Sequence, residues 1–319
     1  MTRWSEILEG ALFPAVPVPF NESKPDFQAQ EKYASWMATQ DIDGVAVWSH
    51  IGRGLHLDKT TRAEVLKCWK KALGAGRKII AGVGPSLDSS RDSFISSAMK
   101  MAEDAEDADF LLVFPPSGFI EQSNPDGMIV NYHKELAKSG KPLILFYLSP
   151  RIGGMEYATD VLDELLSMPE VAGIKMATLD SPILLQDTVT HILINHPDKA
   201  ILTGEDRLYG YSLYRGCHGA LIGMGAAFVD LQREMIDSWF IRELHEFLVL
   251  SSFVDYLAEV IFIEPLSGCT GRILYMLAYL GLIPESSSHD PFAPQITQVE
   301  KEFIKATVDK VRERLDASD

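Results

Sequence analysis

The chain has 319 residues, 46% of them hydrophobic, and a formal net charge of −16 at pH 7. So acidic a chain argues against the basic surface that nucleic acids and anionic membranes require, and we expect it to bind neither. The length predicts one large globular domain or two modest ones with a sizeable apolar core.

Cysteine usage and the apolar segments indicate a cellular compartment. Cys68, Cys217 and Cys269 lie far apart and form no C-x-x-C pair. This disfavours a disulfide framework or a zinc ribbon and is typical of a reducing cytosol. The first residues lack the apolar core of a signal peptide, and the most apolar late stretch, 247–263, is interrupted by two acidic residues. We therefore expect a cytoplasmic protein without a membrane span.

Short apolar segments typical of buried strands recur along most of the chain. They are 12–18, 44–48, 78–83, 110–114, 143–147, 171–175, 200–203 and 219–222. Amphipathic segments typical of helices lie between many of them, among others 28–40, 60–73, 92–105, 127–139 and 159–167. Strand alternating with helix at this spacing predicts an α/β fold with parallel strands, and eight such units have the size of a (β/α)8 TIM barrel.

An open, doubly wound sheet is the alternative architecture. No G-x-G-x-x-G follows the first strand, which disfavours its dinucleotide-binding form. After the eighth strand the pattern is helical, with candidates at 230–250, 252–263, 272–280 and 297–315. We predict a barrel over residues 1–228. Residues 229–319 would supply its last helix and a small C-terminal helical extension that is not an independent domain.

Two neighbouring predicted strands end on reactive side chains, Tyr147 and Lys175. Burying an unpaired ammonium is costly, so such a lysine tends to lose its proton, and the neutral amine is the nucleophile of Schiff-base enzymes. Barrel chemistry lies at the C-terminal ends of the strands. We therefore expect both side chains to point into one barrel mouth, where the phenol would shuttle protons. The alternative is that Lys175 only reaches solvent or pairs with a carboxylate.

Other ionisable residues have simpler interpretations. Glu205 and Asp206 follow the seventh strand and could form an acid–base pair, but acidic residues at a helix start favour a capping role. His218 is expected to contact the backbone, and His133 to pack within a helix. No spacing of histidines and carboxylates resembles a zinc or iron site, so we expect no metal.

Several segments carry motifs that belong together. They are G-I-K-M-A-T-L-D at 173–180, P-L-I-L-F-Y-L-S-P at 142–150, G-E-D at 204–206 and G-C-H-G at 216–219. Together they resemble the dihydrodipicolinate synthase/N-acetylneuraminate lyase superfamily of class I aldolases, over most of the barrel. The resemblance implies Lys175 as the Schiff-base lysine and Tyr147 as the proton carrier. It also implies pyruvate or another 2-oxo acid held as a covalent imine, no metal or organic cofactor, and a homo-oligomer, either tetramer or dimer.

The substrate-binding turn departs from the family pattern. The family's G-T-T-G-E, whose threonines hold the substrate carboxylate and relay protons, corresponds here to S-H-I-G-R at 49–53. The resemblance assigns substrate binding to five positions: Ser49, His50, Ile51, Gly204 and Leu221. Backbone N–H groups of the turn can still bind a carboxylate. We hypothesise that His50 replaces the threonines in relay or carboxylate binding; the alternative is a histidine that fills space. Arg53 is expected to form a structural or interface pair.

Further departures narrow the function. A second relay tyrosine is replaced by P-P-S at 115–117, and Arg151 follows Tyr147 by four residues where the synthases have five. True dihydrodipicolinate synthesis is therefore disfavoured. We predict a Schiff-base lyase acting on pyruvate or another 2-oxo acid by aldol cleavage, aldol addition or dehydration. Two alternatives stay open: a binding or regulatory barrel that lost turnover, and a Schiff-base enzyme acting on an aldehyde.

Overall fold

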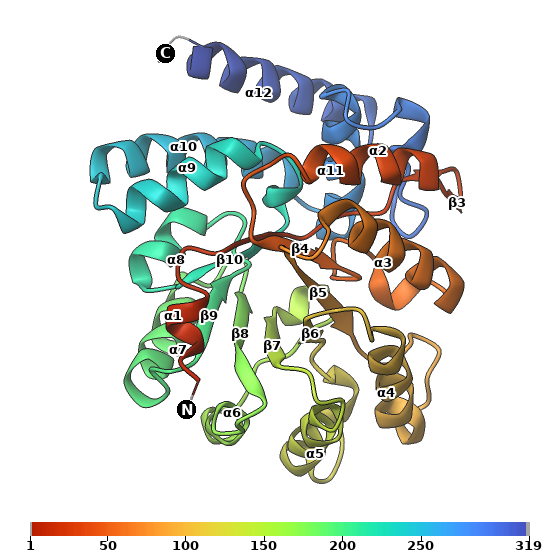
Figure 1. Ribbon diagram of the computed structural model, residues 1–319, viewed down its shortest axis with the longest axis vertical. Helices are drawn as coiled ribbons and strands as arrows, with labels where there is room; N and C mark the ends of the chain where they lie inside the picture. The colour runs from red at the N-terminus through yellow and green to blue at the C-terminus, as the bar shows by residue number, and fades with distance from the viewer. Residues whose placement is uncertain (1, 317–319) are drawn as a thin grey trace.

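Eight short parallel strands close into a barrel in the computed structural model, which describes residues 2–316. The strands are β1 (Leu12–Pro14), β4 (Gly44–Val47), β5 (Lys78–Val83), β6 (Phe110–Val113), β7 (Leu143–Leu148), β8 (Val171–Ala177), β9 (Ala200–Thr203) and β10 (Gly219–Ile222). Their order is β1-β10-β9-β8-β7-β6-β5-β4, and a parallel bridge between Ala15 and Ala46 joins the two ends. The predicted (β/α)8 barrel is confirmed (Figure 1).

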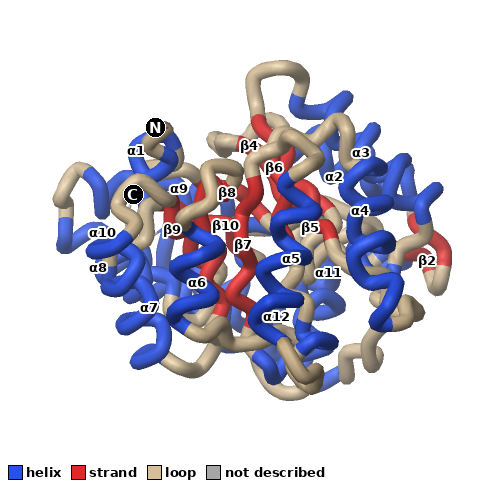
Figure 2. The backbone as a smooth tube through the Cα atoms, turned by 90° about the horizontal axis from the view of Figure 1, so that it is seen from below, coloured by secondary structure: helices blue, strands red, loops and turns tan. Residues whose placement is uncertain are grey.

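Helices surround the strands on the outside (Figures 1 and 2). Those that follow the barrel strands are α2 (Phe27–Met37), α3 (Lys59–Leu73), α4 (Phe94–Asp104), α5 (Pro125–Ala137), α6 (Thr159–Leu166), α7 (Pro182–Asn195), α8 (Tyr209–Arg215) and α9 (Val229–Phe240). Side-chain caps fix three of their starts: Asp26, Asp58 and Asn124 accept N–H groups from the first turns of α2, α3 and α5. A four-residue helix, α1 (Trp4–Ile7), precedes β1, and a small hairpin of β2 (Phe20–Asn21) and β3 (Lys24–Pro25) follows it.

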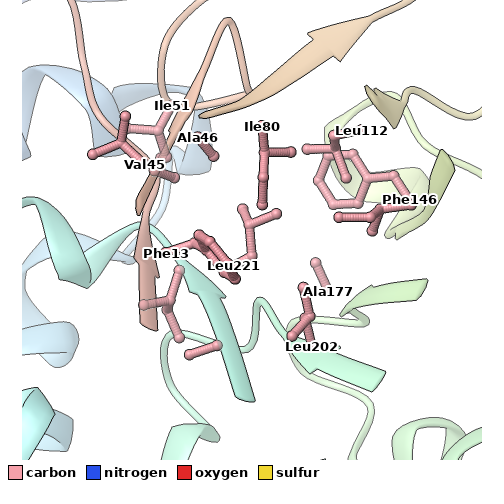
Figure 3. Close-up of a cluster of buried hydrophobic side chains, with 14 of the residues drawn as sticks. Phe13, Val45, Ala46, Ile51, Ile80, Leu112, Phe146, Ala177, Leu202 and Leu221 are labelled. Atoms are coloured by element: carbon pink, nitrogen blue, oxygen red, sulfur yellow. The ribbon is translucent and has the colours of Figure 1, made fainter. Parts of the chain in front are cut away.

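The interior of the barrel is filled by side chains from strands around its circumference. Figure 3 shows this layer, with Phe13, Ile80, Leu112, Phe146 and Leu221 converging. All of them are buried. Strands covered on both faces read as continuous apolar runs, which is why the sequence located them well.

Three further helices extend the chain beyond the barrel: α10 (Leu244–Ile261), α11 (Cys269–Tyr279) and α12 (Gln298–Asp316). They pack on one another, and α10 also packs against α9 (Figure 1). The predicted helix 230–250 is broken in the structure, because residues 241–243 separate α9 from α10 and Arg242 has a left-handed φ of 69°. Within residues 2–316, no helix combines the length and hydropathy that a membrane crossing needs.

Candidate active site

Lys175 lies near the end of β8, with its side chain inside the barrel. Its register partners are Phe146 on β7 and Leu202 on β9, and both belong to the interior cluster of Figure 3. Paired residues on neighbouring parallel strands share one face, so Lys175 also points inward. The residue is only 5% exposed. Gly204 makes room for it, because a Cβ at that position would overlap Lys175 Cε.

Burial is the main influence on the charge of this amine. Removal of the ammonium from water lowers the pKa of Lys175 to about 8, while the carboxylates of Asp206 and Glu205 oppose the shift. The Nζ atom lies 4.4 Å from the centroid of the Phe146 ring. A lysine with this pKa is neutral to roughly one part in ten at pH 7. The neutral amine is the form that attacks carbonyl carbon.

Tyr147 lies on the other face of β7, away from Lys175. Its register partner is Met176, and its ring packs against Tyr157 with centroids 5.7 Å apart. Tyr157 in turn contacts a histidine of α5, so both rings lie between the barrel wall and the helices. The expectation that Tyr147 and Lys175 point into one mouth is therefore wrong. Successive residues of a strand face opposite sides, and the inward position beside the amine belongs to Phe146.

The spacing to Arg151 is the sequence signal that identifies Phe146. Arg151 lies five residues after Phe146, which is the distance that the resembling synthases have between their tyrosine and arginine. Placing the tyrosine role on Tyr147 shifted the strand by one residue. In the structure Arg151 forms ion pairs with Asp180 and Glu264 at the outer end of the site.

Two adjoining cavities lie at this end of the barrel, and Lys175 lines the inner one. The inner cavity, of about 30 Å³, has mostly apolar walls and is lined by His50, Ile51, Phe146, Leu148, Ile152, Lys175, Ala177, Leu179, Gly204, Asp206, Gly223, Phe262, Leu266 and Cys269. The outer cavity, of about 320 Å³, is more polar and contains Arg151, Asp180, Arg207 and Glu264. Four residues line both: Leu179, Asp206, Phe262 and Leu266. These four residues form the boundary that the two cavities share.

Three of the five predicted substrate-binding residues line the inner cavity with Lys175, namely His50, Ile51 and Gly204. Ser49 and Leu221 are not among its lining residues within the described chain. The Ser49 hydroxyl accepts the N–H of Gly52 at 3.3 Å, and Leu221 packs in the interior layer of Figure 3. Burial lowers the pKa of His50 to about 3, helped by the positive charges of Arg53 and Lys175. Its imidazole is therefore neutral near pH 7.

Glu205 and Asp206 lie at the end of β9 and do not cap a helix. The next helix, α8, begins at Tyr209, and no side chain caps its N-terminus. Glu205 instead accepts the backbone N–H groups of Thr178 and Leu179, the latter at 2.8 Å. Asp206 Oδ1 accepts the N–H of Met224 at 2.7 Å. The capping interpretation is wrong, because the chain turns into the cavity before α8 starts.

The C-terminal segment supplies the outer wall of the site. Phe262, Leu266 and Cys269 line the inner cavity although they lie about ninety residues beyond Lys175 in the sequence. No sequence motif marks them, because only the closed barrel brings them to the strand ends. Arg53 holds this segment through a buried ion pair with Asp290 Oδ2 at 2.5 Å and a partly buried hydrogen bond to the backbone carbonyl of residue 267 at 2.7 Å. The structural role expected for Arg53 is thus confirmed.

The remaining histidines lie away from this site. His133 is buried within α5, and His218 Nδ1 accepts the N–H of Ile201, as expected. Asp163, His191 and His196 form a group on the barrel's outside, in which one Asp163 oxygen lies 2.7 Å from the Nε2 atoms of both histidines. These hydrogen bonds account for the convergence of the three side chains.

Comparison with known proteins places this geometry in a family context. N-acetylneuraminate lyase 2 of Escherichia coli O6:H1 is 23% identical over 307 residues, which cover 94% of this chain and 92% of that protein. The 4-hydroxy-tetrahydrodipicolinate synthase of Thermodesulfovibrio yellowstonii is 24% identical over 251 residues, covering 78% and 82%. The solved 4-hydroxy-tetrahydrodipicolinate synthase of Methylacidiphilum fumariolicum SolV has the same fold, with a TM-score of 0.83, 20% identity and 97% of each chain covered.

The two curated relatives carry different activities in their names, so similarity alone leaves the substrate of this chain unassigned. The family-level match is broader. Residues 9–310 match the model described as the Dihydrodipicolinate synthetase family. This range contains all eight barrel strands, Lys175 and the C-terminal segment that closes the site. The chain therefore belongs to the dihydrodipicolinate synthetase family.

Proposed function

We propose that this protein is a Schiff-base-forming lyase in which Lys175 condenses with the carbonyl carbon of a 2-oxo acid. The observation that carries the proposal is a buried amine at a barrel strand end, facing a cavity, with its pKa lowered to about 8. Membership of a family that contains lyases supports the same chemistry. An unreactive structural lysine would be expected to hold hydrogen-bond partners, as Lys199 does with the carbonyls of Met168 and Val171.

The covalent intermediate explains what the site can do. The neutral amine adds to the carbonyl carbon, water leaves, and an iminium forms. Its nitrogen accepts the electron pair that is released when the β-carbon loses a proton or when the bond between the β-carbon and the next carbon breaks. Aldol cleavage, aldol addition and dehydration of a hydroxylated 2-oxo acid all share this step. The imine is the electron sink, so the scheme calls for no metal or organic cofactor.

The cavities support a 2-oxo acid with a substituent beyond its carbonyl. The neutral imidazole of His50 and the backbone of the 49–52 turn would hold the carboxylate. The larger outer cavity, which contains the guanidinium groups of Arg151 and Arg207, would take the remainder of the substrate. Neither threonine hydroxyl of the family turn is present, which disfavours dihydrodipicolinate synthesis as the reaction.

Borohydride trapping tests the proposal directly. The protein is incubated with each member of a panel of 2-oxo acids, pyruvate first, reduced with borohydride and analysed by peptide mass spectrometry. A reduced adduct on the peptide that contains Lys175, absent from Lys175→Arg, is expected. The peptide with Lys199 is the internal control, because this equally buried amine is committed to two carbonyls and should stay unmodified. No adduct with any 2-oxo acid would contradict the proposal.

A binding barrel without turnover is the second candidate. It is favoured by Phe146, a side chain without an ionisable group at the inward position beside the amine. This candidate predicts reversible binding of a 2-oxo acid without an adduct and without any change in the bound molecule. If the protein forms an adduct with an aldehyde but with none of the 2-oxo acids, the result would instead indicate a Schiff-base enzyme that acts on aldehydes.

A further inference from the structure

A Schiff-base cycle needs a group that gives up and takes back protons next to the amine. The inward residue that faces Lys175 on β7 is Phe146, which can do neither. The phenol of Tyr147 packs against Tyr157 behind the strand. The proton carrier of this site must therefore come from another element of the barrel.

We propose that Asp206 is that catalytic acid–base residue; this inference rests on the proposed function. Four ionisable side chains line the inner cavity within the described chain: His50, Lys175, Asp206 and Cys269. Of the four residues that line both cavities, only Asp206 can carry a proton. It therefore stands where the part of a substrate beyond the imine carbon must lie, between the amine and the entrance.

The carboxyl group of Asp206 is held in a fixed position. Its Oδ1 atom accepts the N–H of Met224 at 2.7 Å, which ties the end of β9 to the turn after β10. Gly223 keeps the surrounding space open, because a Cβ there would lie 3.2 Å from Asp206 Oδ1 and 3.1 Å from the Phe262 ring. One oxygen thus serves as an anchor, and the carboxyl group still faces the cavity.

The surroundings of Asp206 suit a group that both donates and accepts a proton. Burial raises its pKa to about 7, and the negative charge of Glu205 acts in the same direction. The Met224 N–H and the Lys175 ammonium lower it in part. A carboxyl that titrates near the working pH is present in both forms, which is the condition for efficient general acid–base catalysis.

The other ionisable groups fit this role less well. Burial keeps His50 neutral with a pKa of about 3, so it cannot act as an imidazolium acid. Burial raises the pKa of the Cys269 thiol to about 11, which makes its proton too tightly held. Glu205 uses one oxygen for the N–H of Thr178 and the other for that of Leu179. Its carboxylate is thereby committed to the backbone after β8.

The proton steps balance as follows. The neutral amine of Lys175 adds to the carbonyl carbon, and a proton moves from nitrogen to oxygen to give the carbinolamine. Asp206 as a carboxylic acid protonates that hydroxyl, the C–O bond breaks, water leaves, and the nitrogen lone pair forms the iminium. Asp206, now a carboxylate, removes a proton from C3, and the C–H electron pair forms the enamine. Return of the proton to C3 restores the iminium. In cleavage the carboxylate instead takes the C4 hydroxyl proton, and the C3–C4 pair forms the enamine as the aldehyde leaves.

Pyruvate separates imine formation from proton transfer in one experiment. Adduct formation is followed by borohydride trapping, and proton transfer by deuterium uptake into the pyruvate methyl group in D2O, measured by proton NMR. Asp206→Asn keeps an oxygen for the Met224 N–H but cannot titrate. We expect it to form the Lys175 adduct while methyl exchange falls roughly 100-fold or more. Tyr147→Phe is the matched control, and its exchange should match that of the unaltered protein.

Two further variants sharpen the test. Phe146→Tyr, introduced together with Asp206→Asn, places a phenol beside Lys175. The double variant should recover part of the methyl exchange that Asp206→Asn loses. Asp206→Glu keeps a carboxyl and should exchange faster than Asp206→Asn; if the Asn variant does not fold, Asp206→Ser carries the same comparison. An adduct with exchange undiminished in a folded variant without the carboxyl overturns the role of Asp206 alone. Absence of an adduct in the unaltered protein with pyruvate and with every other 2-oxo acid of the panel overturns the proposed function, and the role of Asp206 with it.

Discussion

Lys175 is a nucleophile only to the extent that it is neutral, and its surroundings act on that fraction in opposite directions. Burial favours the neutral amine, whereas the carboxylates of Asp206 and Glu205 favour the ammonium. Burial has the larger effect, so the pKa of Lys175 is about 8, whereas that of an ordinary lysine is about 10.4. The site therefore gains reactivity from its apolar walls and loses part of it to the acid that it needs for proton transfer.

Competitive labelling with acetic anhydride tests this balance. Because the reagent attacks neutral amines, the labelling rate of Lys175 should rise tenfold per pH unit and level off above about pH 8. Asp206→Asn removes a negative charge that stabilises the ammonium, so its midpoint should move to lower pH. Peptide mass spectrometry gives both curves, with exposed Lys67 as the reference amine. A Lys175 midpoint close to pH 10 would contradict the proposed desolvation.

The sequence predicts those site residues whose role can be recognised from their immediate neighbours in the chain. Lys175 is recognisable because a lysine ending an apolar strand stands out on its own. The choice between Phe146 and Tyr147 is not local, since a shift of one residue exchanges the two faces of a strand and both residues are aromatic. The sequence favours a capping role for Asp206, because its actual partner, the N–H of Met224, lies in the turn after the next strand and no local pattern indicates it.

At the scale of elements, the loop 262–268 depends on one buried arginine. Arg272 of α11 donates to the carbonyls of residues 261, 263 and 265, at 3.1, 2.8 and 3.3 Å. Its other side pairs with Glu300 at 2.8 Å, and Thr297 and Glu300 form a capping box at the start of α12. The start of α12 thus holds the loop that carries Phe262 and Leu266 over the cavity.

Replacement of Arg272 by Met tests this support. The variant removes the side-chain donor of the carbonyls of residues 261 and 263 and the cation that pairs with Glu300, whereas the carbonyl of residue 265 still accepts the N–H of Gly268. Because a buried ion pair is broken, the free energy of unfolding should fall by about 3–5 kcal/mol. Denaturant titration measures the change. Arg242→Met is the control, because this exposed arginine only lies over the Trp239 ring, and it should shift stability by less than about 1 kcal/mol. A loss below about 1 kcal/mol for Arg272→Met would show that the loop is held by other contacts.

The sequence located the strands better than the helices beyond them. Buried parallel strands are apolar on both faces and stand out against polar helices, which is why all eight were found. The first predicted strand, 12–18, is longer than the observed β1, which ends at Pro14, and Pro17 lacks the N–H that a strand ladder requires. The break between α9 and α10 has no such signal. It depends on the left-handed conformation of Arg242, which its residue type does not favour.

At the scale of the whole molecule, an exposed apolar patch supports the predicted homo-oligomer. Tyr214 of α8, Ile241 after α9, and Leu244 and Leu248 of α10 are between 52% and 65% exposed. These helices are neighbours in the fold (Figure 1). Large apolar side chains gathered on adjacent helices are typical of protein–protein contacts. Burial of the patch between two copies of the chain would remove this surface from water.

Charge decides how such an association should respond to salt. Each chain carries a net charge of −16, so two copies repel each other at long range, and added salt screens this repulsion while apolar burial persists. Analytical ultracentrifugation should therefore show an oligomer that strengthens as ionic strength rises. Leu248→Glu should weaken it at least tenfold, because it buries a charge in the contact. Ile7 on α1 is similarly exposed and lies outside the patch, so Ile7→Glu should leave the association unchanged. A monomer at all salt concentrations, or equal effects of the two substitutions, would contradict assembly through this patch.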